Sequence, residues 1–206
     1  TPVAKGYEAV VGAVGDLVEK LEGDFDSPLP VGIGTPGTIS RKTGFMKNSN
    51  TTSLNHRPFK EDLQKRINRE IRMANDANCF ALSEAVDGAA RDYAVVFGVI
   101  LGTGVGGGVI FNRKIHEGPN SIAGEWGHNI LEESGPDCYC GKTGCVETLL
   151  SGPGFEQDYR GLGGEPLAAF EIEERLAAGE EIANRAFERY VDRLGKALAT
   201  LMGVLD

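Results

Sequence analysis

The 206-residue chain has no apolar run long enough to cross a bilayer, which takes about 20 residues. Its start, Thr1-Pro2-Val3-Ala4-Lys5, lacks the apolar stretch of a secretory leader. Basic side chains are also few, since 21 Lys and Arg stand against 30 Asp and Glu, a net charge of −9. A surface that binds duplex nucleic acid needs clustered Lys and Arg. We therefore expect neither a membrane nor a nucleic acid as partner.

Cysteine is scarce as well, yet three of the four cysteines, Cys138, Cys140 and Cys145, lie close together after His128. Three thiolates and an imidazole are the ligand set of a closed tetrahedral zinc site. The alternatives are a disulfide among these cysteines, or buried free thiols with no role. Cys-x-Cys pairs bridge poorly and three cysteines leave one unpaired, so zinc is favoured. A metal site of thiolates also favours the reducing cytoplasm as the location.

Two further segments suggest ligand binding. Asn75-Asp76-Ala77-Asn78 lies where a predicted strand over residues 71–74 turns into a helix over residues 79–86. Asp76 there is either a helix cap or a carboxylate placed to take a proton from a hydroxyl. Residues 102–108 include five glycines between two apolar strands, 93–101 and 109–111. Such a turn is first a β-hairpin, but its backbone N–H groups can also cradle phosphate oxygens.

The remaining pattern predicts alternating helices and strands. Apolar spacing predicts helices over 7–22, over 58–71, from 155, over 170–178 and over 182–205, and a short buried strand over 31–34. A helical position away from the other cysteines predicts Cys79 in the core. Asn48 and Asn50, in a polar loop, are weak candidates for a ligand site.

The motifs together resemble those of the ROK family of repressors and sugar kinases. Gly124–His128 followed by Cys138–Glu147 is similar to the family signature Gly-Glu-x-Gly-His … Cys-x-Cys-Gly-x-x-Gly-Cys-x-Glu. Leu101–Gly108 resembles the second phosphate motif of the actin–hexokinase ATPase fold, and Asn75–Asn78 resembles the family's catalytic turn. The three motifs stand in the family's order.

This resemblance implies an α/β protein of the actin–hexokinase (ribonuclease H-like) fold, with two lobes that meet at a cleft. The expected lobes are residues 1–93 and residues 94–206. The family's first phosphate hairpin, Asp-x-Gly-Gly-Thr-Lys, and its C-terminal adenosine motif do not occur in the printed sequence. We therefore expect a fold incomplete at both termini, without kinase activity as 206 residues alone.

The resemblance also implies site residues. Asp76 would be the general base, and Gly102, Thr103 and Gly104 would hold the phosphates of ATP. The metal ligands would be His128, Cys138, Cys140 and Cys145. The sugar ligands would be Gly37, Asn75, Asp76, Glu125, His128 and Glu147. The implied cofactors are structural Zn²⁺ and ATP with Mg²⁺.

The implied activity is ATP-dependent phosphorylation of a hexose at its 6-hydroxyl, by a homodimer. Residues around the zinc box look most like bacterial fructokinases and mannokinases, so fructose or mannose is the expected substrate. N-acetylglucosamine kinase is the alternative, because Asn75–Ala85 and the glycine turn fit it equally well. A second alternative is the sugar-sensing domain of an ROK transcriptional repressor, although such proteins often lose the catalytic Asp. A third is a stand-alone zinc-binding interaction domain.

Overall fold

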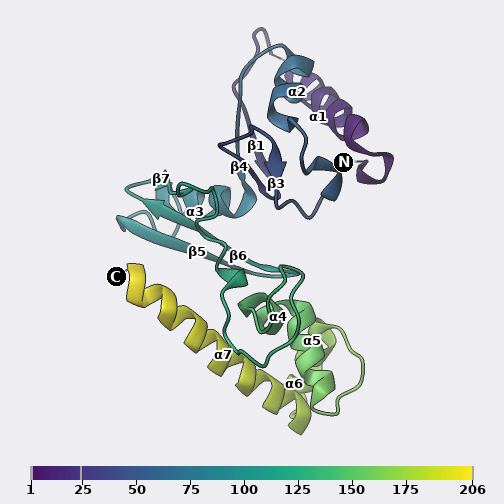
Figure 1. Cartoon of the computed structure of the whole chain (residues 1–206), viewed down its shortest axis with the longest axis vertical. Coiled ribbons are helices and arrows are strands. Elements are labelled where there is room, and N and C mark those ends of the chain that lie inside the picture. The colour runs from purple at the N-terminus through teal and green to yellow at the C-terminus, as the bar shows by residue number, and fades with distance from the viewer. Residues whose placement is uncertain (1, 24, 206) are drawn as a thin grey trace.

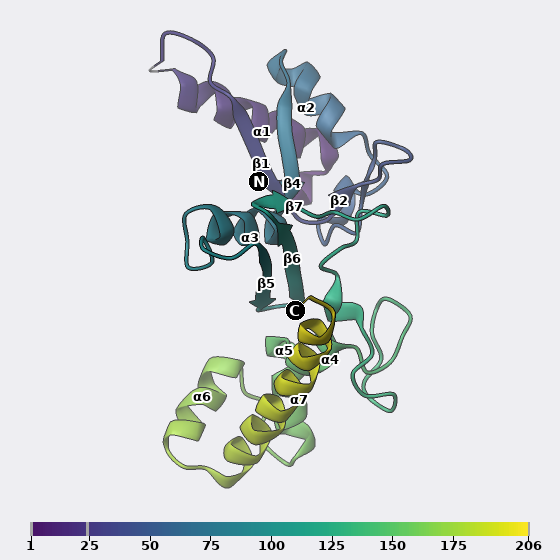
Figure 2. The same ribbon diagram turned by 90° about the vertical axis from the view of Figure 1, so that its left-hand side faces the viewer.

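The computed structural model describes residues 2–23 and 25–205. The molecule is elongated, with α1, α2, β1 and β4 at one end and α4 to α7 at the other (Figure 1). The sheet of β5, β6 and β7 lies between these two groups with α3 beside it, as the view turned by 90° confirms (Figure 2).

The N-terminal group is built on two parallel strands, β1 (Val31–Thr35) and β4 (Ile71–Asn75), paired in register Thr35 to Asn75. Helices α1 (Tyr7–Glu22) and α2 (Phe59–Ile67) pack on each other, and a short hairpin joins β2 (Thr38–Ile39) to β3 (Met46–Lys47). Short 3-10 helices cover Val3–Lys5 and Thr52–Leu54. The buried core of this group is Tyr7, Val10, Val11, Met46, Leu54, Phe59, Leu63 and Ile71.

The central sheet is antiparallel, in the order β5 (Val95–Leu101), β6 (Val105–Phe111) and β7 (Lys114–Ile115). Helix α3 (Asp76–Val86) follows β4 directly and packs on β5 and β6 through Ala81 and Ala85, which are fully buried. Because α3 contacts both this sheet and β4, it connects the N-terminal group to the sheet. The division into residues 1–93 and 94–206 stays a prediction.

The C-terminal group consists of helices. A 3-10 helix (Trp126–His128) precedes α4 (Val146–Leu150), α5 (Gly152–Gly161), α6 (Ala169–Ala177) and the long α7 (Glu181–Leu205). Trp126, Leu149 and Ala197 bring the 3-10 helix, α4 and α7 into one core. The loop over residues 128–145 carries the predicted metal ligands and is called the metal loop below. This core holds the metal loop and the β5–β6 turn next to each other.

Several local expectations are corrected. The helix predicted to reach residue 71 ends at Ile67, because Asn68 adopts the left-handed conformation (φ 53°) and the chain turns into β4. Strand β1 is not buried throughout, since Gly32 and Gly34 are exposed, and both ends of β5 are exposed as well. Cys79 is exposed on α3 rather than part of the core.

The glycine-rich stretch is also shorter as a turn than expected, because β6 begins at Val105. Gly106, Gly107 and Gly108 are strand residues, and Gly107 and Gly108 leave room for close packing. A Cβ on Gly108 would lie 2.6 Å from the carbonyl oxygen of Ala77 at the start of α3. Glycine there lets the helix approach the strand backbone.

Within residues 2–23 and 25–205, no helix is both long and apolar enough to span a membrane.

Candidate active site and metal centre

The turn from β4 into α3 is fixed by Asn75. Its side-chain oxygen accepts hydrogen bonds from the backbone N–H of Ala77 (3.0 Å) and of Asn78 (3.3 Å), so Asn75 is the helix cap. Its Nδ2 donates to the carbonyl oxygen of Gly37 at 3.1 Å. Asp76 is therefore the first helical residue and is exposed, with Oδ1 accepting from the N–H of Ala77 at 2.8 Å. The cap role belongs to Asn75, which leaves the Asp76 carboxylate facing solvent.

Gly37 is required by its backbone. It has a φ of 73°, and a Cβ would lie 2.5 Å from the carbonyl oxygen of Lys47. The turn after β1 can therefore pack against β3 only with glycine at this position. This packing, with the hydrogen bond from Asn75, brings two of the predicted sugar-site segments together.

The β5–β6 turn of Gly102, Thr103 and Gly104 is held from both sides. Gly102 donates its N–H to the carbonyl oxygen of Gly104 (2.9 Å) and accepts from the N–H of Gly152 at the start of α5 (2.8 Å). Glu147 accepts the N–H of Val105 through Oε2 at 2.9 Å. A predicted sugar ligand therefore directly contacts the end of the predicted phosphate turn.

Glu125 is brought to the same region by Gly124. Gly124 has a φ of 94°, and a Cβ on it would collide with the carbonyl oxygen of Gly107 in β6. A small pocket next to this crossing is lined by Thr38, Asn75, Asn78, Gly107, Glu117, Ser121, Ala123 and Glu125. The predicted sugar ligands Asn75 and Glu125 thus line one pocket between β4 and the loop after β7. The pocket lining does not include Asn48 or Asn50.

The charges around Glu125 show which groups converge. Although the residue is exposed overall, burial around its carboxyl group is the largest cause that raises its pKa. The carboxylates of Glu147 and Asp76 raise the pKa further, whereas His128 and Lys47 lower it. Asp76, His128 and Glu147, all predicted from the sequence as site residues, therefore lie within electrostatic reach of Glu125.

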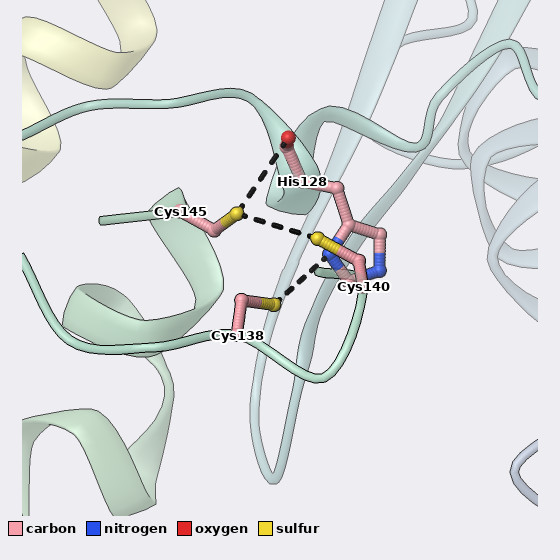
Figure 3. Close-up of side chains that lie close together, drawn as sticks. All are labelled: His128, Cys138, Cys140 and Cys145. Atoms are coloured by element: carbon pink, nitrogen blue, oxygen red, sulfur yellow. Dashed lines mark hydrogen bonds between the residues drawn. The ribbon is translucent and has the colours of Figure 1, made fainter. Parts of the chain in front are cut away.

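The predicted metal ligands converge as well (Figure 3). One ligand atom from each of His128, Cys138, Cys140 and Cys145 lies within 4.8 Å of all the others. The Sγ atoms of Cys140 and Cys145 are 3.6 Å apart, and Sγ of Cys138 lies 3.6 Å from Nδ1 of His128. Two sulfurs each about 2.3 Å from one zinc in a tetrahedron lie roughly 3.7 Å apart. All four cysteines are free thiols, so the disulfide alternative finds no support. The residues fit a zinc ion.

Hydrogen bonds of the loop itself keep this cluster together. Leu131 and Glu132 both donate backbone N–H groups to the carbonyl oxygen of Gly144, at 2.8 and 3.2 Å, and Val146 donates to that of Asn129 at 2.9 Å. Ile130 also forms an isolated antiparallel bridge with Cys145. The backbone thus places Cys145 opposite the segment that follows His128.

Two residues that sequence reasoning did not single out belong to this region. The hydroxyl oxygen of Tyr139 lies 3.1 Å from Nε2 of His128, and the two rings meet edge to face with centroids 5.2 Å apart. The sequence signal was its place between two cysteines. Arg193, on α7, is buried. The apolar spacing of this helix predicted a packing face and gave no sign that Arg193 belongs to the region.

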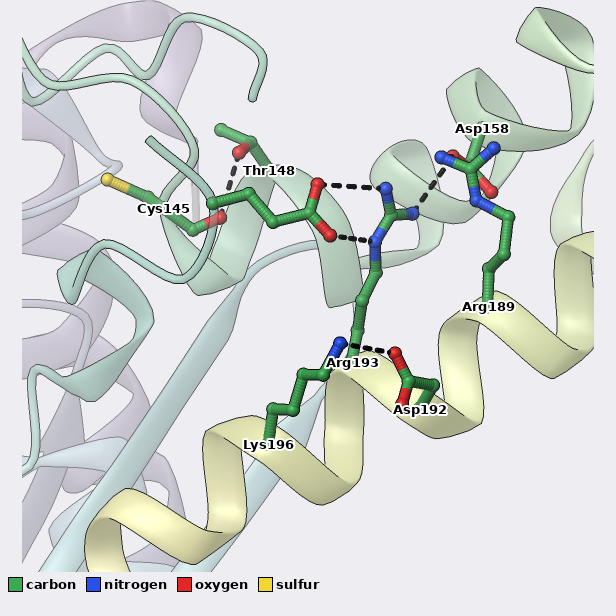
Figure 4. A network of polar contacts seen from close by, with 8 residues as sticks. Cys145, Thr148, Asp158, Arg189, Asp192, Arg193 and Lys196 are labelled. Atoms are coloured by element: carbon green, nitrogen blue, oxygen red, sulfur yellow. Dashed lines mark hydrogen bonds and ion pairs between the residues drawn. The ribbon is translucent and has the colours of Figure 1, made fainter. Parts of the chain in front are cut away.

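Arg193 connects the metal loop to two helices (Figure 4). Its Nε and Nη2 donate to the two carboxylate oxygens of Glu132, at 2.7 and 3.1 Å, and its Nη1 lies 2.9 Å from Oδ1 of Asp158 on α5. Arg189 also pairs with Asp158 at 3.0 Å, and a further pair joins Lys196 to Asp192. The loop that carries the predicted metal ligands is therefore bound to α5 and α7 through the buried Arg193.

The chain belongs to the ROK family, whose family model matches residues 1–206. An N-acetyl-D-glucosamine kinase of Pasteurella multocida (strain Pm70) is 40% identical over 213 residues, covering 98% of this chain and 70% of the relative. These matches confirm the family that the motifs predicted.

Solved structures agree on the fold. The ROK hexokinase from Thermus thermophilus has a TM-score of 0.85 at 30% identity, covering 96% of this chain and 66% of that chain. A ROK family glucokinase from Streptomyces griseus, in complex with glucose and AMPPNP, has a TM-score of 0.76 at 27% identity, covering 98% and 70%. The chain thus spans about two thirds of the length of these kinases. The α/β fold of the ROK kinases is confirmed, and these relatives are sugar kinases, the class that the motifs predict.

Proposed function

We propose that the full-length protein is an ATP-dependent sugar kinase that phosphorylates N-acetylglucosamine. The observation that carries the proposal is that Asp76, His128 and Glu147 all act on the carboxyl group of Glu125, and that Glu147 also accepts the N–H of Val105 at the end of the β5–β6 glycine turn. The substrate is supported by the Pasteurella multocida relative, which is named an N-acetyl-D-glucosamine kinase. Fructose or mannose, preferred on the zinc-box residues, is the second candidate substrate.

In this proposal, the carboxylate of Asp76 accepts the proton of the sugar's 6-hydroxyl, whose oxygen then attacks the γ-phosphate of ATP while the bond from that phosphorus to the bridging oxygen breaks and ADP leaves. Asp76 suits the role because it is exposed at the carboxyl end of β4 and is not the helix cap. Backbone N–H groups of Thr103 and Gly104 bind phosphate oxygens, whereas the N–H of Gly102 is bonded to the carbonyl oxygen of Gly104 and shapes the turn. Mg²⁺ bound with ATP would supply positive charge to the transferring phosphoryl group.

The sugar's other hydroxyls are bound by Glu125, His128 and Glu147, and Asn75, which is bonded to Gly37, lines the same pocket as Glu125. Polar groups that a bound sugar covers discriminate between sugars, because a hydroxyl missing from the ligand leaves them without a partner. Glu147 has a second task, since its contact with Val105 aligns the sugar site with the phosphate turn.

We further propose structural zinc on His128, Cys138, Cys140 and Cys145. Burial and the neighbouring thiols raise the pKa of Cys145, so without a cation this thiol stays protonated at neutral pH. Four protein ligands fill a tetrahedron and leave no open position for water or substrate. Bound there, zinc would hold the loop between His128 and Cys145 in shape. The two ends of that loop carry Glu125 and Glu147.

An ADP-release assay of the full-length protein across N-acetylglucosamine, fructose, mannose and glucose tests this function. We expect activity that depends on both ATP and sugar, with the highest kcat/KM for N-acetylglucosamine. Asp76→Asn should lose about 10²- to 10⁴-fold in kcat while it still binds sugar. Asp92→Asn, at an exposed site, is the matched control. A protein that binds sugar but releases no ADP would instead favour the sugar-sensing domain of a repressor.

A further inference from the structure

We propose that Tyr139 competes with the substrate for one hydrogen-bonding position of the sugar site. Its hydroxyl takes the hydrogen-bonding position on His128 that a sugar hydroxyl needs, so an incoming sugar has to displace it. This inference rests on the proposed function, because it assigns Tyr139 to the sugar site of that kinase. It adds a side chain that the family motif leaves unspecified, since Tyr139 is the variable residue in Cys-x-Cys.

The two nitrogens of His128 face different partners. Nδ1 lies 3.6 Å from Sγ of Cys138, on the side of the metal cluster. Nε2 points away from the thiols and lies 3.1 Å from the hydroxyl oxygen of Tyr139. Once Nδ1 is a metal ligand, Nε2 is the one hydrogen-bonding position left on the ring. In this structure Tyr139 holds that position.

The Tyr139 hydroxyl contacts a group that the proposed function assigns to the sugar. Its partner at 3.1 Å, His128, is one of the three side chains proposed to bind the sugar's other hydroxyls. A sugar hydroxyl at this point would therefore need the ring nitrogen that the phenol holds.

Tyr139 is held loosely enough to be displaced. The residue is 84% exposed, and its ring meets His128 only edge to face, at an interplanar angle of 90°. Rotation of the side chain into solvent therefore breaks one hydrogen bond and loses little packing. The ring sits at the tip of the metal loop, between Cys138 and Cys140, so the backbone can stay fixed while the side chain moves.

The consequence is a direct competition. A sugar with a hydroxyl at this point replaces the phenol on His128, whereas a sugar without one leaves the phenol in place. Removing the phenol oxygen should therefore tighten sugar binding by about the value of one neutral hydrogen bond, roughly two- to tenfold. Because Tyr139 touches neither the phosphate turn nor Asp76, the change should appear in KM and not in kcat.

The experiment compares zinc-loaded, full-length wild type with Tyr139→Phe in ADP-release assays on N-acetylglucosamine and fructose. Tyr93→Phe is the control, since Tyr93 is another exposed tyrosine (67%) outside the site. We expect Tyr139→Phe to lower the sugar KM by about two- to tenfold, with unchanged kcat and zinc content, and Tyr93→Phe to match wild type.

The ADP-release assay of the wild-type protein tests the proposed function, which fails if the wild-type protein phosphorylates no sugar. The inference is judged separately, on the ratio of the variant to wild type. An unchanged KM in an active, fully zinc-loaded Tyr139→Phe protein overturns it, because the phenol then does not compete. A raised KM also overturns it, because the hydroxyl would then bind the sugar directly.

Discussion

Replacing Arg193 by Met should strongly destabilise the C-terminal group. The guanidinium is 7% exposed and makes two hydrogen bonds to Glu132 and one ion pair to Asp158, whose side chain is 12% exposed. Breaking a buried charge pair by removing one partner costs about 3–5 kcal/mol. Glu132 is 38% exposed and Arg189 stays near Asp158, which places the expected loss at the lower end, about 3 kcal/mol.

Thermal and urea unfolding would measure this loss. In a domain of this size, about 3 kcal/mol lowers Tm by roughly 6–12 °C. Lys196→Met on the same helix is the control, because its pair with Asp192 is exposed on both sides (64% and 62%) and should contribute below about 1 kcal/mol. Adding Glu132→Gln and Asp158→Asn to Arg193→Met should recover much of the stability, since no buried charge is then unpaired.

The pH dependence gives an independent check. The hydrogen bonds from Arg193 hold the pKa of Glu132 below its ordinary value of 4.5. A carboxyl group with a lowered folded pKa stabilises the protein above its unfolded pKa and loses this effect as pH falls through the folded pKa. The difference between wild type and Arg193→Met should therefore be complete at pH 7 and shrink below about pH 4. A variant within about 0.5 kcal/mol of wild type at pH 7 would refute the reasoning.

Two further predictions concern the metal loop and the central sheet. Cys140→Ser should lower zinc content and raise the sugar KM without changing the KM for ATP; full sugar affinity in a verified metal-free sample would contradict a positioning role for zinc. Gly108→Ala should unfold at lower urea concentration, because its Cβ would lie 2.6 Å from the carbonyl oxygen of Ala77, and overpacking costs about 1–3 kcal/mol. Gly106→Ala is its control, since no atom lies within 4 Å of an added Cβ, and equal losses in both would show that strand propensity and not packing sets the effect.

Periodicity predicted most helices from the sequence, and motif spacing predicted the cluster of metal ligands. The helix over residues 7–22 appears as expected, and the four predicted metal ligands lie close together, because apolar spacing and ligand type are local properties of the chain. The glycines of β6 were misassigned for a non-local reason. Gly107 and Gly108 look like a turn in sequence, but they are strand residues that α3 and Phe97 cover closely. Only the packing partner, distant in sequence, explains them.

The capping of α3 illustrates the same limit at the site. Asn75 and Asp76 are both good cap residues, so composition alone could not decide between them. In the structure Asn75 is the cap, because its side-chain oxygen accepts the N–H groups of Ala77 and Asn78. Its Nδ2 is at the same time bonded to Gly37, a contact across 38 residues of chain that holds the amide in this orientation. Arg193 was missed for a similar reason, since a charged residue on an amphipathic helix is usually solvated and its two partners lie 61 residues away and on another helix.

Glu147 connects the loop of the predicted metal ligands to the start of β6. It lies two residues after Cys145, in the first turn of α4, and accepts the N–H of Val105 where β6 begins. A shift of Cys145 would therefore be passed through one turn of helix to Glu147, the proposed sugar ligand. Arg193 contacts the same loop through Glu132, whose N–H donates to the carbonyl oxygen of Gly144 next to Cys145. The proposed metal and the buried Arg193 would thus both hold the position of a single carboxylate, that of Glu147.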